Sequence, residues 1–80
     1  MLLREERAAI NVKRAMSDAG AQFELKGLER AVEGYVATFQ MGMVTHVEAQ
    51  IEESVVEDEP PTPALQALIQ RVQAAFGGMT

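Results

Sequence analysis

The chain has 80 residues, of which 24% are charged and 48% are hydrophobic, and these values are typical of one globular domain over residues 1–80 rather than of a disordered chain. It contains no cysteine, which excludes disulfides and thiolate metal sites. Its net charge is −5, and the six acidic residues between positions 48 and 59 have no basic residue among them. Direct nucleic-acid binding is therefore disfavoured, because phosphate contacts need clustered lysine and arginine.

The sequence contains no candidate membrane segment. No apolar run approaches the ~20 residues of a membrane span, and the start MLLREERAAI lacks the apolar core of a signal peptide. Together with the lack of cysteine, this predicts a soluble cytoplasmic protein without membrane contacts. A chain of this size buries only about 60% of its unfolded surface. We therefore expect a homodimer or a higher homo-oligomer to supply further stability.

Residues 2–19 are predicted to form a helix that Gly20 ends. Residues 21–26 alternate between apolar and polar, which predicts a short strand with Phe23 and Leu25 on one side and Gly27 as its terminator. Residues 28–33 fit either a helical turn or the start of the next strand. The apolar side of the helix is expected to hold Leu2, Ala9, Val12, Met16 and Ala19, flanked by Ala8 and Ile10.

The stretch over residues 34–56 has the clearest periodicity in the chain. Because strand side chains alternate between faces, its pattern predicts a sheet with one apolar and one polar face. Apolar spacings of three and four also fit one long helix over residues 28–53, but Gly34 and Gly42 would each cost about 1 kcal/mol within it. The odd positions, apolar except for one threonine, are Tyr35, Ala37, Phe39, Met41, Met43, Thr45, Val47, Ala49 and Ile51.

A turn at Gly42 is expected to fold this stretch into a hairpin, since one strand of that length would be unusual. A three-residue loop centred on Gly42 would pair Phe39 with Thr45 and keep the odd positions on one face. A two-residue turn at Met41-Gly42 would instead set Phe39 against Val44 and mix the faces.

Residues 55–62 are predicted to be an exposed acidic connector, because adjacent prolines cannot continue a helix or a strand. Thr62 is a suitable N-cap and Pro63 suits the first turn of a last, amphipathic helix. The fold class is therefore a small two-layer α+β domain: an N-terminal helix, a two- or three-stranded antiparallel sheet that turns near Gly42, and a C-terminal helix. The apolar stripe of that helix comprises Leu65, Leu68, Ile69, Val72, Ala75 and Phe76.

Few residues could carry chemistry. His46 is the only histidine and is predicted on the polar face of the sheet with Glu48, but structural and catalytic zinc sites need three or four ligands. The carboxylates of the acidic segment are sequential, whereas glycosidase chemistry needs two that face each other across a cleft. We therefore predict a protein that is not an enzyme and that holds no metal or cofactor.

The order helix, strands, helix resembles the topology of double-stranded-RNA-binding domains. Those domains carry a basic cluster at the start of the last helix, whereas residues 62–66 read TPALQ here and follow a run of acids. The resemblance therefore implies a topology and no RNA binding. In size and charge the chain is also similar to small acidic phage proteins, including anti-CRISPR inhibitors and head–tail components.

These observations predict a non-catalytic protein-binding module that self-associates and presents an acidic face to a basic protein partner. The alternatives are a structural subunit of a larger assembly, such as a virion or a compartment, and an acidic nucleic-acid mimic that blocks a nucleic-acid-binding protein. The stripe of the last helix either completes the core or packs against a second chain. The acidic face is predicted to comprise Glu48, Glu52, Glu53, Glu57, Asp58 and Glu59. The predicted contacts for self-association are Met41, Met43, Leu65, Leu68, Ile69, Val72 and Phe76.

Overall fold

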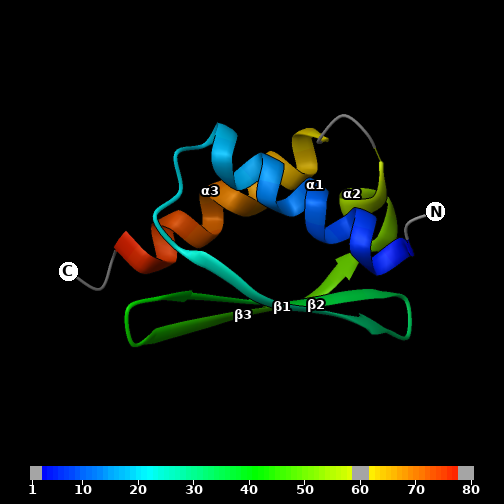
Figure 1. Ribbon diagram of the computed structural model, residues 1–80, viewed down its shortest axis with the longest axis horizontal. Helices are drawn as coiled ribbons and strands as arrows, with labels where there is room; N and C mark the ends of the chain where they lie inside the picture. Colours follow the sequence, from blue (N-terminus) through cyan, green and yellow to red (C-terminus); the bar gives the residue numbers. More distant parts are fainter. Residues whose placement is uncertain (1–2, 59–61, 78–80) are drawn as a thin grey trace.

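Three helices cover one face of a three-stranded antiparallel sheet, and no helix of the described residues covers the other face (Figure 1). The computed structural model describes residues 3–58 and 62–77. The strands are hydrogen-bonded in the order β1-β2-β3, which confirms the predicted α+β fold and contradicts the long helix over residues 28–53. The elements are α1 (Arg4–Asp18), β1 (Glu24–Ala31), β2 (Gly34–Met41), β3 (Val44–Glu52), α2 (Glu53–Glu57) and α3 (Pro63–Gly77).

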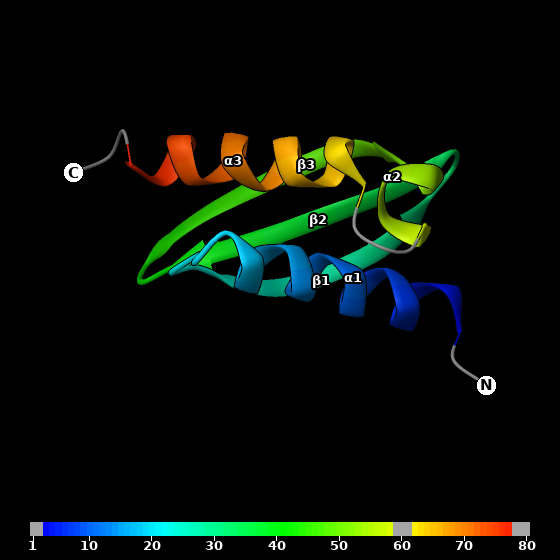
Figure 2. The ribbon, with the colours of Figure 1, turned by 90° about the horizontal axis from the view of Figure 1, so that it is seen from above.

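The first helix lies over the sheet beside α3, as Figure 2 shows from above. Gly20 has a φ of 65° and follows the end of α1, as predicted. The predicted apolar side is confirmed at Val12 and Met16, the flanking Ile10 is exposed, and Leu2 lies outside the described residues. The buried residues are Ala8, Asn11, Val12, Ala15 and Met16.

Asn11 is buried because its amide joins α1 to the end of α2. Its Nδ2 donates a hydrogen bond of 2.9 Å to the carbonyl oxygen of Val56 and one of 3.4 Å to that of Asp58. The last carbonyls of a helix have no partner within the helix, so this side chain supplies donors that the short α2 lacks. The contact joins segments that are 45 residues apart in the chain.

The first strand is longer than predicted. It continues through Gly27 to Ala31, so the prediction that Gly27 ends a short strand was wrong, and residues 28–31 belong to β1. The ladder with β2 shifts register between Leu25 and Gly27, which marks a β-bulge at the glycine. Phe23 lies just before the strand, and its ring is 5.5 Å from that of Phe39 and 5.2 Å from that of Phe76.

The hairpin between β2 and β3 turns at Gly42 as predicted, but its register differs from the predicted one. The loop is the two residues Gly42 and Met43, and Phe39 lies opposite His46. Gly42 has a φ of 62°, and a glycine with positive φ at the first turn position is typical of type II′ turns, which join strands tightly. The even positions of β3 therefore face the helices as far as residue 48, where the odd positions were expected.

A bulge in β3 then restores the odd positions to the inner side. Tyr35 lies opposite Ile51 but Ala37 lies opposite Glu48, so one extra residue stands in β3. Gln50 adopts a φ of 63° at this point. Because the bulge reverses the alternation, Ile51 packs in the core while Val47 lies on the outer face.

The predicted connector over residues 55–62 is partly helical. Residues 53–57 form α2, and Val56 is fully buried, so the prediction of an exposed segment was wrong there. Residues 59–61 lie outside the described part of the chain. Thr62 caps α3 as predicted: its Oγ1 accepts a hydrogen bond of 3.1 Å from the Leu65 amide and donates one of 3.1 Å to the carbonyl oxygen of Val55.

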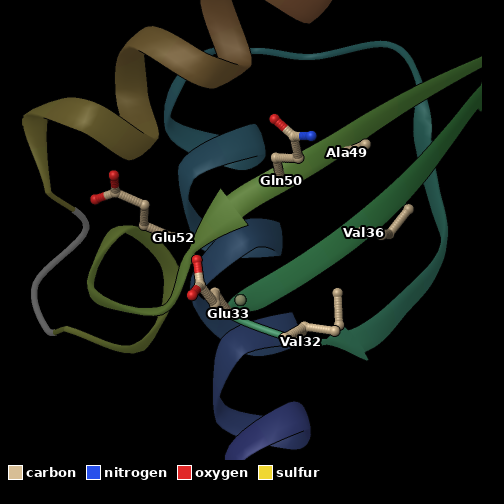
Figure 3. Close-up of a pocket in the computed structure, with 8 residues that line it drawn as sticks. Val32, Glu33, Val36, Ala49, Gln50 and Glu52 are labelled. Atoms are coloured by element: carbon tan, nitrogen blue, oxygen red, sulfur yellow. The ribbon is translucent and has the colours of Figure 1, made fainter.

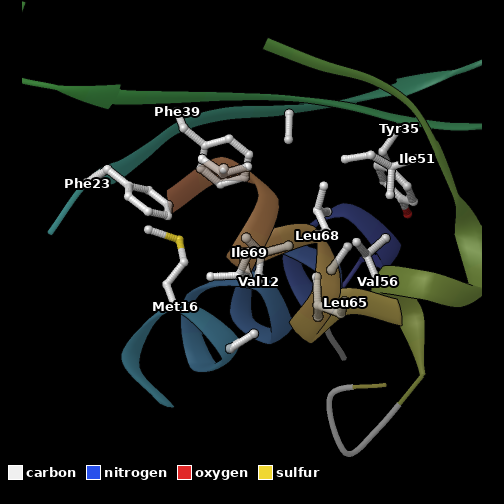
Figure 4. Close-up of a cluster of buried hydrophobic side chains, with 14 of the residues drawn as sticks. Val12, Met16, Phe23, Tyr35, Phe39, Ile51, Val56, Leu65, Leu68 and Ile69 are labelled. Carbon is white, nitrogen blue, oxygen red and sulfur yellow. The ribbon is translucent and has the colours of Figure 1, made fainter. Parts of the chain in front are cut away.

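The core lies between the inner face of the sheet and the helices, as Figure 4 shows. The stripe of α3 contributes Leu65, Leu68, Ile69, Val72 and Phe76, all buried, so of the two predicted alternatives the stripe completes the core. In the described ranges, no helix is both long enough and apolar enough to cross a membrane.

Substitution of Gly34 tests how closely the end of β3 approaches the start of β2. A Cβ atom at Gly34 would lie 1.9 Å from the carbonyl oxygen of Ile51, whereas one at Gly27 would meet nothing within 4 Å. We expect Gly34→Ala to lower the free energy of unfolding by at least about 2 kcal/mol through overpacking, and Gly27→Ala to change it by less than about 0.5 kcal/mol. Urea unfolding followed by circular dichroism measures the free energy of unfolding of both variants. Equal effects of the two substitutions would contradict the close approach of β3 to Gly34.

Candidate functional site

The open face of the sheet is the surface that no helix covers, and we define it by the outward residues of the three strands. Thr38 and Val47 are paired at its centre, and Val47 is 54% exposed. Val36 and Thr38 are half-buried by their neighbours in the sheet. The pairing places these residues on this face: Glu29, Val36, Thr38, Gln40, Thr45 and Val47.

An open hollow of about 590 Å³ lies at one end of this face, where the β1–β2 turn meets the bulge of β3 (Figure 3). Its lining combines apolar side chains with carboxylates and an amide. Val32, at the turn, is 97% exposed. The full lining is Ala31, Val32, Glu33, Gly34, Val36, Ala49, Gln50 and Glu52.

The two ends of the open face differ in charge. Glu29, Glu33 and Glu52 lie at the hollow end, and they take part in no ion pair among the described residues. At the other end, Lys26 lies 3.6 Å from Glu24, and both side chains are mostly exposed. The hollow end is therefore strongly acidic, while the end near Gly42 is close to neutral.

A polar cluster ties β3 to α3 on the inner side of the sheet. His46 Nε2 lies 2.8 Å from Glu48 Oε1, and Arg71 Nη2 donates a hydrogen bond of 3.2 Å to Glu48 Oε2. The His46 ring also packs edge-on against Phe76, with ring centres 6.1 Å apart. The prediction of His46 on the polar outer face was wrong, because the two-residue turn directs residues 46 and 48 inward. They are tolerated there because β3 is an edge strand, Arg71 pairs with Glu48, and Glu48 pairs with His46.

The charge of Glu48 is stabilised by this cluster. Burial alone would raise the pKa of its carboxyl, but the hydrogen bonds from Arg71 and His46 outweigh burial and lower the pKa below its usual value of 4.5. The Glu48 side chain is only 14% exposed, so its ion pair with Arg71 is less screened by water than a surface pair. The cluster therefore fixes the carboxylate in place.

A second cluster holds α2 against the sheet. Arg30 Nη2 lies 2.7 Å from Glu53 Oε1, and Tyr35 donates a hydrogen bond of 2.8 Å to Glu57 Oε2. The Arg30 guanidinium also stands 5.2 Å from the centre of the Tyr35 ring. Burial raises the pKa of the Tyr35 hydroxyl, and the neighbouring Arg30 opposes this effect. The hydroxyl thus stays protonated and remains a donor to Glu57.

The residues predicted to form one acidic face lie in different settings. Glu48 is paired with Arg71, and Glu53 and Glu57 are both paired with Arg30. Glu52 lines the hollow, Asp58 is exposed, and Glu59 lies outside the described residues. The structure thus brings Glu53 and Glu57 together but directs Glu48 to another side of the molecule. Their part in binding a partner stays a prediction.

Of the residues predicted for self-association, those on α3 are enclosed in the core. Met41 is half-buried and packs against the core, whereas Met43 is 98% exposed at the hairpin tip. A contact with a second chain can therefore involve Met43 without any rearrangement, and the stripe of α3 has no surface to offer. No group of three or more histidine or acidic residues in the described ranges could hold a metal ion.

Comparison with protein-family models, with curated proteins and with solved structures found no match. The function therefore has to be inferred from the residues of this chain and their placement.

The open face could not be predicted from the alternation alone, which places Val47 and Ala49 on the apolar side of the sheet with the core residues. Two signals were available. Val36 and Val44 break the expected alternation, and a glycine followed by a single residue before a β-branched run fits a two-residue turn as well as a three-residue loop. The bulge at residues 49–50 had no sequence signal, since no glycine stands there.

The lowered pKa of Glu48 predicts a defined loss of stability in acid. The carboxylate stabilises the fold fully above its unfolded pKa near 4.5, and this contribution is lost as the pH falls through the lower folded pKa. We expect Glu48→Gln to flatten the fall of the unfolding free energy below pH 4.5 and to cost about 1 kcal/mol at pH 7. Glu52→Gln, on the same strand but without an ion pair, should keep the wild-type slope. Identical slopes for Glu48→Gln and the wild type, in urea titrations at several pH values, would contradict this role.

Proposed function

We propose that the protein is a non-catalytic interaction module that self-associates through the open face of its sheet. The observation that carries the proposal is the uncovered centre of this face, where the half-buried Val36 and Thr38 of β2 adjoin Val47 of β3, which is 54% exposed. A sheet normally buries its apolar side against another layer, and this sheet has two sides with apolar residues but one layer of helices. A second copy supplies the missing layer.

The size of the open face sets the expected strength of a dimer. The face is three strands wide and eight or nine residues long, so its outline is about 400 Å². Stable protein interfaces bury about 800 Å² on each partner, so the expected dimer is weak and forms only at high protein concentration. Burial of its apolar part would stabilise each chain in addition to its small core.

The acidic component of the proposal is confined to the hollow end of the open face. Glu29, Glu33 and Glu52 lack ion-pair partners within the described part of the chain. They form a negative field that would steer a basic protein towards the ends of a dimer. A nucleic-acid mimic is less well supported, because Glu48 is paired with Arg71, and Glu53 and Glu57 share an ion pair with Arg30.

Self-association is tested by a charge placed at the centre of the open face. We expect Val47→Glu to raise the dimer dissociation constant by about tenfold or more, because it buries an unpaired carboxylate in the interface. Ile10→Glu makes the same change at an exposed position on α1 and should leave the constant within about twofold. Sedimentation equilibrium measures both. A wild-type protein that stays monomeric at 100 μM, or equal effects of the two variants, would refute the proposal, and large rings or filaments would favour a structural subunit instead.

The position of the acidic field is tested with a basic peptide. We expect Glu29→Gln with Glu33→Gln to weaken the binding of an oligolysine peptide by about threefold more than Glu5→Gln with Glu6→Gln, which removes the same charge from α1. Fluorescence titration at low salt measures both affinities. Equal losses would mean that only the net charge attracts the peptide.

A further inference from the structure

We infer that the two copies pair in opposite directions, so that the β2–β3 hairpin tip of each copy, Gly42–Met43, lies in the hollow of the other. This inference rests on the proposed self-association through the open face and assigns its geometry. It gives a role to the two features of that face that the fold leaves unexplained, an exposed methionine and an open hollow with a partly apolar lining.

The tip offers an apolar group that no described residue of its own chain covers. Met43 is 98% exposed, and Gly42 gives the turn the positive φ that keeps it narrow. Methionine is unbranched and polarizable, so it fills irregular apolar spaces well. The hollow provides such a space with the side chains of Val32, Val36 and Ala49, beside the polar Gln50.

The tip and the hollow lie at opposite ends of the same face, as Figures 1 and 3 show together. The tip joins the end of β2 at Met41, and the hollow includes the start of β2 at Gly34. In the proposed dimer, a two-fold axis lies between the two stacked sheets, parallel to them and perpendicular to the strands. Rotation about this axis places the tip end of one copy over the hollow end of the other. Each tip then meets a hollow, and both contacts form at once, as an isologous dimer requires. The axis passes close to the Thr38–Val47 pair, which buries the apolar centre.

Charge also favours this arrangement. A two-fold axis along the strands would instead place hollow on hollow and bring Glu29, Glu33 and Glu52 close to the same three carboxylates of the second copy, without a cation between them. Like charges at an interface are strongly unfavourable. The opposite pairing sets these carboxylates near the end that carries Lys26, where the charge is almost balanced. The acidic hollow thus selects the orientation in which the tip enters it.

The lack of native cysteine makes the contact directly testable by cross-linking. We expect the double variant Met43→Cys with Ala49→Cys to form a disulfide-linked dimer under mild oxidation, seen on a non-reducing gel. A bond within one chain is excluded, because six residues of strand span about 20 Å and a disulfide joins Cα atoms less than about 7 Å apart. Each single variant is the control and should cross-link at least tenfold more slowly.

The other outcomes overturn the inference in distinguishable ways. Efficient cross-linking of the single variant Met43→Cys would show that the two hairpin tips lie against each other. Efficient cross-linking of the single variant Ala49→Cys would show that the two hollows face each other. A dimer by sedimentation that shows no cross-link specific to the double variant would refute this geometry and leave the open-face dimer standing, whereas a monomeric protein would refute both.

A second measurement does not depend on cysteine chemistry. Met43→Glu should raise the dimer dissociation constant at least tenfold, while Leu3→Glu, which changes an exposed leucine before α1, should leave it within twofold. Equal constants for these two variants would also overturn the inference.

Discussion

The position of one extra residue in β3 determines what each side of this sheet presents. The two-residue turn at Gly42 directs His46 and Glu48 towards the helices, and without a correction it would also direct Ile51 away from them. The bulge at residues 49–50 makes that correction, so the last apolar residue of the strand returns to the core. Side chains alternate strictly along a regular strand, so Val47 and Ile51, four residues apart, would lie on the same face without the bulge. The extra residue between them places Val47 on the outer face and Ile51 on the inner face.

The polar clusters follow from the same register. Once His46 and Glu48 face the helical layer, they need partners, since an unpaired buried carboxylate is costly. Arg71 on α3 and the edge position of β3 meet that need. Arg30 meets the corresponding need of Glu53 and Glu57 at the other end of the sheet. Half of the acids that seemed free in the sequence, Glu48, Glu53 and Glu57, therefore hold elements together, while Glu52 lines the hollow.

The sequence was sufficient for the architecture but not for the site. The stripe of α3, the cap at Thr62 and the turn at Gly42 rest on local rules that few tertiary contacts override, and each was predicted correctly. The length of the turn and the bulge at Gln50 depend on how Ile51 meets the core, which is a long-range contact without a local signal. The open face and the hollow depend on both, so they could be located only in three dimensions. The short α2 was missed for the same reason, since Asn11 and Val56 stabilise it across 45 residues of sequence.

Both outer strands of the sheet carry a bulge, one between Leu25 and Gly27 and one at residues 49–50. An edge strand with a regular row of free amide and carbonyl groups can add strands from other molecules without limit, and bulges interrupt that row. Growth of the sheet sideways into fibres is therefore hindered on both flanks. The bulges therefore leave the open face, rather than the two edges of the sheet, as the place where a further layer can be added.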